Sequence, residues 1–125
     1  MANGCHRALI VEDDPAIRRL VEKLLTRKGV EIVTAHDGRE AIGHLRDGDF
    51  SVVVLDLMVP EVNGFEVIDF IKREEKRVPV AVVSAVSQQA LTDLDLDVVK
   101  LVISKPFDVV EFTKGVIGLC NQGAD

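Results

Sequence analysis

The sequence predicts a doubly wound α/β sandwich, in which helices cover both faces of a five-stranded parallel sheet. Short, continuously apolar runs such as 8–11 are typical of strands buried on both faces of a sheet. The segments between these runs carry apolar residues at helical spacing. This alternation recurs five times in 125 residues, and no internal repeat or low-complexity segment interrupts it.

The predicted strands are the five apolar runs. In chain order they cover residues 8–11, 30–35, 50–55, 78–83 and 101–103. In an open parallel sheet, ligands bind outside the carboxyl ends of the strands, where the strand order reverses. The residues that follow each strand are therefore the candidates for a functional site.

A helix is predicted after each strand. Asp14 is a suitable N-cap for the first helix, Pro15 fits its first turn, and Lys28–Gly29 closes it. A weaker helix is expected around residues 89–96. In the other helices, apolar residues recur at helical spacing: Ile17, Leu20, Val21, Leu24 and Leu25; Ala41, Ile42 and Leu45; Phe65, Val67, Ile68 and Ile71; and Val109, Phe112, Val116 and Leu119.

Composition predicts one compact domain over residues 1–125, because 47% of the residues are hydrophobic and the mean hydropathy is +0.20. Fifteen Lys and Arg against 21 Asp and Glu give a net charge of -6, which argues against direct nucleic-acid binding through a general basic surface. The absence of a signal sequence or a long apolar span predicts a cytoplasmic protein without membrane insertion. Cys5 and Cys120 are expected to be reduced thiols.

Five polar residues follow the predicted strands and are expected to meet at one edge of the sheet. They are Glu12, Asp13, Asp56, Ser84 and Lys105. Each alone fits an ordinary role in a cap, a turn or a solvated surface. Three crowded carboxylates, however, repel one another unless a cation neutralises them, and hard oxygen ligands suit Mg²⁺. With Lys105 as a second positive charge, Asp56 could accept a phosphoryl group while Ser84 donates a hydrogen bond to it.

These residues stand in motifs that resemble those of the receiver domains of two-component response regulators. The motifs are LIVEDDP at 9–15, VVLDLMVPEVNG at 53–64, VVSA at 82–85 and SKPF at 104–107. The resemblance covers residues 7 to about 120, leaving short tails at both ends. It implies a (βα)5 flavodoxin-like, three-layer fold with strand order 2-1-3-4-5, as in a chemotaxis receiver.

The resemblance implies a role for each matching residue at the acidic end of the site. Asp56 would be the phosphoacceptor and a metal ligand. Asp13 would bind Mg²⁺ directly, Glu12 would act through water, and Met58 would offer its backbone carbonyl. Mn²⁺ could replace Mg²⁺.

On the other side of the acceptor, the resemblance implies that Lys105 binds the phosphoryl group and that Ser84 reorients on phosphorylation. Pro106 is expected to follow a cis bond, and Gly64 matches the glycine after the acceptor. The family usually has Tyr or Phe at the position of Val102. In the family this aromatic side chain swings inward when the Ser or Thr moves, and Val102 cannot supply such a side chain.

The implied function is to take a phosphoryl group from a phosphohistidine of a sensor histidine kinase or a histidine phosphotransfer protein and to change a partner-binding surface. Met58 and Val86 cannot hold a hydrolytic water, so we expect slow self-dephosphorylation. The downstream protein or output domain is not identified by the sequence. A homodimer through the last two helices is one further arrangement.

Two other functions remain open at this point. A haloacid-dehalogenase-type phosphatase also uses an aspartate nucleophile and Mg²⁺, but it needs a second Asp where this chain has Met58. A receiver-like interaction module that is never phosphorylated would be consistent with Val102, although the acidic residues and Lys105 argue against it.

Overall fold

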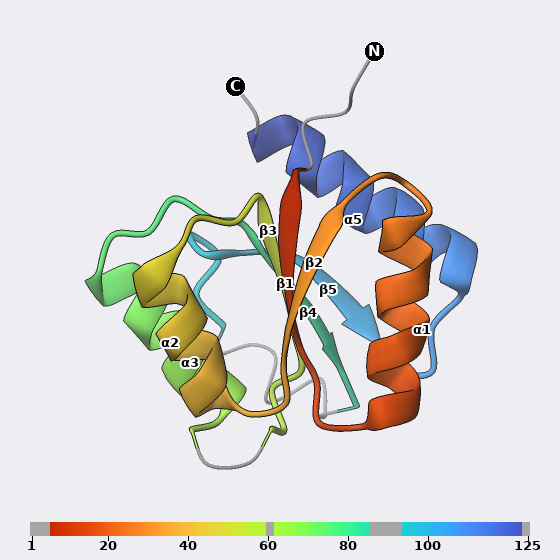
Figure 1. Ribbon diagram of the computed structural model, residues 1–125. Helices are drawn as coiled ribbons and strands as arrows, with labels where there is room; N and C mark the ends of the chain where they lie inside the picture. The colour runs from red at the N-terminus through yellow and green to blue at the C-terminus, as the bar shows by residue number, and fades with distance from the viewer. Residues whose placement is uncertain (1–5, 60–61, 86–93, 124–125) are drawn as a thin grey trace.

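A computed structural model describes residues 6–59, 62–85 and 94–123. Its sheet is five-stranded and entirely parallel, with the order β2-β1-β3-β4-β5 (Figure 1). This confirms the predicted fold class and strand order. The strands are β1 (Arg7–Val11), β2 (Glu31–Ala35), β3 (Val52–Leu55), β4 (Val80–Ser84) and β5 (Val99–Ser104).

The helices form two outer layers, with α1 and α5 on one side of the sheet and α2 and α3 on the other (Figure 1). The four helices within the described ranges are α1 (Pro15–Thr26), α2 (Gly38–Asp47), α3 (Gly64–Arg73) and α5 (Val109–Gly123). Most of the helix predicted around residues 89–96 lies outside the described residues. The described part, 94–96, is a bend followed by a turn, so the prediction is wrong for these residues.

Alternating strand side chains enter two separate apolar cores. On β1, Leu9 and Val11 pack towards α2 and α3, whereas Ala8 and Ile10 pack towards α1 and α5. Neighbouring side chains of a strand point to opposite faces, so a sheet that is covered twice needs apolar residues at every position. This explains why the central strands read as uninterrupted apolar runs.

The edge strand β5 differs most from its prediction. It spans Val99–Ser104, whereas the sequence predicted 101–103, and its exposure alternates along the strand. Lys100 and Val102 are on the exposed side. Lys100 interrupted the apolar run and so concealed the beginning of the strand.

Polar side chains cap the first turns of all four helices. Asp14 accepts hydrogen bonds from the backbone N–H groups of Ala16 and Ile17, and Pro15 opens α1 as predicted. Asp37, Asn63 and Asp108 cap α2, α3 and α5 in the same way. Each cap fixes the loop that leads into its helix. For α1, α2 and α5 this loop directly follows a strand at the edge where the predicted site residues lie.

Two further observations concern the helices. Cys120 on α5 is buried and disulfide-bonded, so the expectation of a reduced thiol there is wrong; Cys5 lies outside the described residues. None of the helices in the described part of the chain is long and apolar enough to cross a membrane.

Gly64 should be intolerant of any side chain. A Cβ added there would lie 2.6 Å from Leu57 Cα and 2.9 Å from the Asp56 carbonyl oxygen, both backbone atoms that cannot turn away. We expect Gly64→Ala to lower the free energy of unfolding in urea by about 2 kcal/mol or more.

The matched control is Gly43→Ala on α2, where an added Cβ meets no atom within 4 Å. Because Ala favours a helix over Gly, this variant should be more stable by up to about 1 kcal/mol. Equal stability of the two variants would contradict the close approach at Gly64.

Candidate functional site

The sheet order brings the predicted site residues together. Val11 and Leu55 are paired in the ladder between β1 and β3, so Glu12 and Asp56 leave the sheet side by side. Ser84 ends β4, and Lys105 follows β5. The side chains of Glu12, Asp56 and Ser84 are buried, whereas Asp13 is exposed. Every predicted site residue at the strand ends therefore lies at this one edge.

Lys105 links the two buried carboxylates. Its Nζ donates to Glu12 Oε1 at 2.7 Å and to Asp56 Oδ2 at 2.9 Å. The carboxylates are only 6% and 8% exposed, so little water screens these two ion pairs. The sequence predicted a lysine beside Asp56, but it did not predict that the same ammonium group pairs with Glu12.

The charges of this triad shift two pKa values. Burial, together with the nearby Asp56 carboxylate, raises the pKa of Glu12 from 4.5 to about 7, although the hydrogen bond from Lys105 opposes the rise. Burial lowers the pKa of Lys105, but its hydrogen bonds to Glu12 and Asp56 outweigh this effect and raise the pKa overall. Lys105 therefore stays charged across the neutral range.

Backbone and hydroxyl groups orient the acceptor carboxylate. The Met58 N–H donates to Asp56 Oδ1 at 3.0 Å, and the Ser84 hydroxyl donates to the same oxygen at 3.4 Å. Lys105 holds the other oxygen, Oδ2. Both oxygens of Asp56 are thus held in place.

The carboxylates also suit a hard metal ion. Glu12, Asp13 and Asp56 each offer an oxygen, and these oxygens all lie within 4.8 Å of one another. Among the described residues, Lys105 is the one cation that forms an ion pair with these three carboxylates, so negative charge remains to be neutralised. Exposed Asp13 keeps one side open to water. This donor set fits Mg²⁺, which prefers oxygen ligands and retains several waters.

Two contacts at the site were not predicted from the sequence. Arg18 on α1 donates from Nη1 to the carbonyl oxygen of Glu12 at 2.9 Å, and the N–H of Asp14 donates to Glu12 Oε2 at 3.2 Å. Together they fix the Glu12–Asp13 turn. The sequence indicates the Arg18 contact only through the position of Arg18, four residues after the cap residue Asp14. This signal is weak because the same spacing is common on exposed helices.

Three further predictions concern Pro106, Val102 and Val86, which lie outside the carboxylate cluster. The bond between Lys105 and Pro106 is cis, as predicted. Val102, which replaces the family's aromatic residue, is 40% exposed on β5 and lines a hollow of 390 Å³ together with Phe107 and Phe112. Val86 lies outside the described residues.

A second group of possible ligands lies after β2. His36 Nε2 is 2.8 Å from Glu40 Oε2, and His36 Nδ1 is 3.6 Å from Asp37 Oδ2. Asp37 also caps α2. These contacts assign His36 a structural role at the surface.

Comparison with known proteins gives a family match over most of the chain. The sequence model of the response regulator receiver domain matches residues 8–117. An uncharacterized transcriptional regulatory protein of Bacillus subtilis, YcbL, is 37% identical over 109 residues, which are 86% of this chain and 48% of the relative. The transcriptional regulatory protein TcrA of Mycobacterium tuberculosis is 39% identical over 87 residues, which are 70% of this chain and 34% of the relative. The chain thus spans less than half the length of these two relatives.

A solved structure resembles both the sequence and the fold. The response regulator protein TrrA from Thermotoga maritima, in complex with Mg²⁺ and BeF, is 31% identical, with a TM-score of 0.81. The match covers 91% of this chain and 98% of that chain.

The raised pKa of Glu12 should make stability depend on pH. Below about pH 4.5 this carboxyl is protonated in both the folded and the unfolded chain. Between 4.5 and about 7 the unfolded chain ionises first, so the free energy of unfolding falls as the pH rises. In metal-free buffer with EDTA, we expect wild type to lose up to about 3 kcal/mol over this interval relative to Glu12→Gln.

Urea unfolding of the two proteins at several pH values between 4 and 8 measures this difference. Glu12→Gln is a close control because it keeps the shape and a hydrogen-bond acceptor for Lys105. Parallel stability curves for the two proteins would show that Glu12 is not protonated in the folded state near neutral pH.

Proposed function

Because the chain belongs to the response regulator receiver domain family, we propose that it takes a phosphoryl group from a phosphohistidine onto Asp56. The observation that carries this proposal is the position of the Asp56 carboxylate. It is buried at the end of a central strand, paired with Lys105 and next to two further carboxylates. A sensor histidine kinase or a histidine phosphotransfer protein would supply the phosphoryl group.

In the transfer step, an oxygen of Asp56 attacks the phosphorus atom with a lone pair. The bond between phosphorus and the donor's imidazole nitrogen breaks, and that nitrogen leaves with the electron pair. Lys105 neutralises charge on the phosphoryl oxygens, and the Ser84 hydroxyl donates a hydrogen bond to one of them. The product is an aspartyl phosphate.

We infer that Asp13 and Asp56 hold Mg²⁺ directly, that Glu12 acts through water, and that Met58 contributes its carbonyl oxygen. Bound Mg²⁺ supplies charge neutralisation for the phosphoryl oxygens. Mn²⁺ fits the same oxygen ligands. The complex of TrrA with Mg²⁺ and BeF, at 31% identity, supports this proposal.

The signal would leave the site through Ser84. Its hydroxyl is buried at the end of β4, where a phosphoryl group on Asp56 would draw it inward. Val102 gives no aromatic side chain to follow that movement. We therefore propose that the backbone after β4 transmits the change, either to a downstream protein or to a homodimer through the last two helices.

Phosphorylation of Asp56 can be tested without the natural donor. Incubation with Mg²⁺ and acetyl phosphate should add one phosphoryl group, which intact-protein mass spectrometry detects. Asp56→Asn should abolish the adduct because the amide is a poor nucleophile, whereas Asp47→Asn on the exposed end of α2 should retain it. An adduct that persists in Asp56→Asn, or no adduct with any donor, would contradict the proposal and favour an interaction module that is not phosphorylated.

The phosphoryl group should be lost slowly. The Met58 side chain is 66% exposed beside the acceptor and has no strong hydrogen-bonding group to place a hydrolytic water. Met58→Asn, alone or with Val86→Glu, should shorten the lifetime of the phosphorylated protein severalfold, as measured by loss of the mass adduct. Met58→Leu should leave the lifetime unchanged, and an unchanged rate in Met58→Asn would refute this account.

A further inference from the structure

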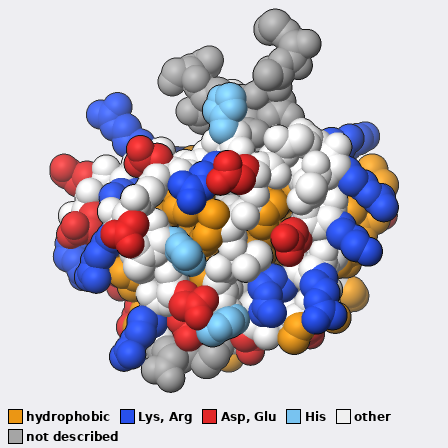
Figure 2. All heavy atoms as spheres, viewed as in Figure 1, with side chains coloured by type: hydrophobic (Ala, Val, Ile, Leu, Met, Phe, Trp, Pro, Cys, Tyr) orange, Lys and Arg blue, Asp and Glu red, His pale blue; other side chains and the backbone are white. Residues whose placement is uncertain are grey.

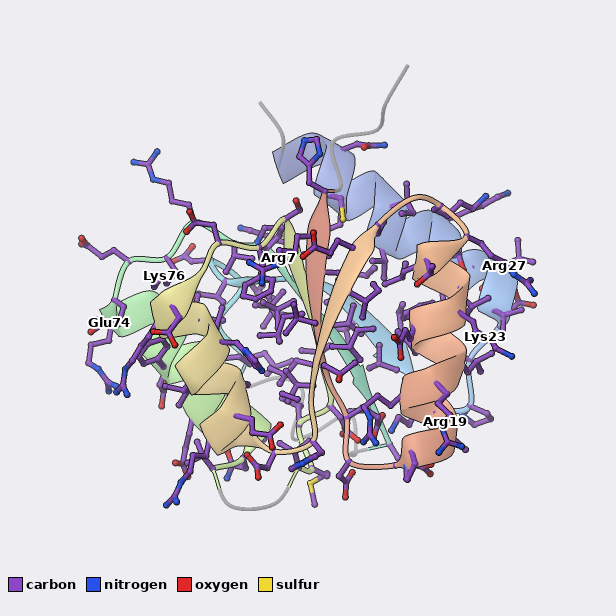
Figure 3. All side chains as sticks on the ribbon, in the orientation of Figure 1. Arg7, Arg19, Lys23, Arg27, Glu74 and Lys76 are labelled. Carbon is purple, nitrogen blue, oxygen red and sulfur yellow. The ribbon has the colours of Figure 1, made fainter. Side chains whose placement is uncertain are left out.

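A stripe of cations runs along the exposed face of α1. It consists of Arg19, Lys23 and Arg27, which are spaced four residues apart and therefore lie above one another on the helix. Figure 3 shows all three side chains pointing away from the sheet, on the outer side of α1. Among the described residues none of them forms an ion pair. Like charges at this spacing repel one another, although Lys23 and Arg27 lie at the carboxyl end of α1, where the helix dipole favours cations.

Arg27, at the end of the stripe, and the neighbouring Lys28 line an apolar groove between α1 and α5. The groove has a volume of 660 Å³, and its walls include Leu24, Val109, Val110 and Ile117. Lys114 adds a further cation on the α5 side. Figure 2 shows Lys and Arg side chains gathered on this side of the molecule, with exposed hydrophobic side chains between them. The groove is thus apolar along its floor and positive along its rim.

The charge of this face is opposite to that of the whole chain. The net charge is -6, yet Glu22 is the only acidic residue on α1 and Glu111 the only one on α5. Glu111 lines the separate hollow beside Val102 and not this groove. A local positive rim on an acidic protein selects partners by charge complementarity.

We propose that the groove between α1 and α5 binds an amphipathic helix of a partner protein whose polar face is acidic. Two neighbouring helices form a trough into which a third helix can pack with apolar residues at positions i, i+3, i+4 and i+7. Acidic residues beside that apolar stripe would meet Arg27, Lys28 and Lys114, which line the groove, while Lys23 and Arg19 extend the positive charge along α1. The interaction does not involve Asp56 and is independent of the proposed phosphoryl transfer.

Other occupants fit the groove less well. A second copy of this chain in a symmetric contact would place the cation stripes of both copies near each other. Among the described residues that line the groove, none is an aromatic residue on which nucleobases could stack. Leu24 and Ile117 are only partly exposed within the groove, whereas Val109 and Val110 are exposed; competition by vesicles therefore tests whether this surface enters a membrane instead.

The probe for a binding test is a synthetic amphipathic helix with leucines at i, i+3, i+4 and i+7 and glutamates on its other positions. Titration calorimetry and amide chemical shifts of the labelled protein measure its affinity and its location. We expect shifts along α1 and α5 and binding that weakens with added salt. Binding should be at least tenfold weaker when lysines replace the glutamates or alanines replace the leucines.

Two matched pairs of variants locate the groove. Gly118 lines it, and an added Cβ there meets no atom within 4 Å, so Gly118→Leu should fill the groove without disturbing the fold. Its control, Gly43→Leu, adds the same side chain to open space on α2. Replacing Arg19, Lys23 and Arg27 with Gln removes the stripe; replacing Arg39, Arg73 and Arg77 with Gln removes three exposed cations elsewhere.

We expect Gly118→Leu and the stripe variant each to weaken binding at least tenfold, while both controls and Asp56→Asn stay within twofold of wild type. The proposal is overturned if the basic helix binds as tightly as the acidic one, or if Gly118→Leu binds normally. It is also overturned if single-stranded DNA or vesicles containing phosphatidylserine compete as well as the acidic helix, because the face would then be a general polyanion surface.

Discussion

The pairing of Lys105 with two buried carboxylates is the constraint on which the rest of the site depends. Glu12 and Lys105 are 93 residues apart in the chain and meet only if the strands are in this order. Because β4 lies between β3 and β5, the Lys105 side chain spans the end of β4 to reach Asp56. Removing Lys105 would leave both buried carboxylates without this ammonium group, and breaking a buried ion pair in this way typically costs about 3 to 5 kcal/mol.

The same pairing leaves the site incompletely neutralised. One ammonium group faces Glu12 and Asp56, while Asp13 adds a third carboxylate at the open side. The raised pKa of Glu12 reflects this surplus of negative charge together with burial. A divalent cation would remove the surplus.

The sheet was predictable from the sequence because burial on both faces requires apolar residues at every position, as in 52–55. The edge strand was predicted less accurately, since Lys100 can face water there and interrupts the pattern. The site residues were predictable as a set, because each follows a strand. Their pairing was not, since it depends on three-dimensional distances: the Glu12–Lys105 contact and the hydrogen bond from Arg18 have no periodic signal.

Helix α1 joins the site to the cationic groove, and its sequence shows how one helix can serve both. Its first turns face the site, where Asp14 caps the helix and Arg18 fixes the carbonyl of Glu12. Its buried stripe, with Val21 and Leu25, holds it against the sheet. The outer face of α1 does not pack against the sheet, so packing does not explain its cations Arg19, Lys23 and Arg27. Because α1 is held at its first turns by the site and along its buried stripe by the sheet, its outer face can meet a partner without contact with Asp56.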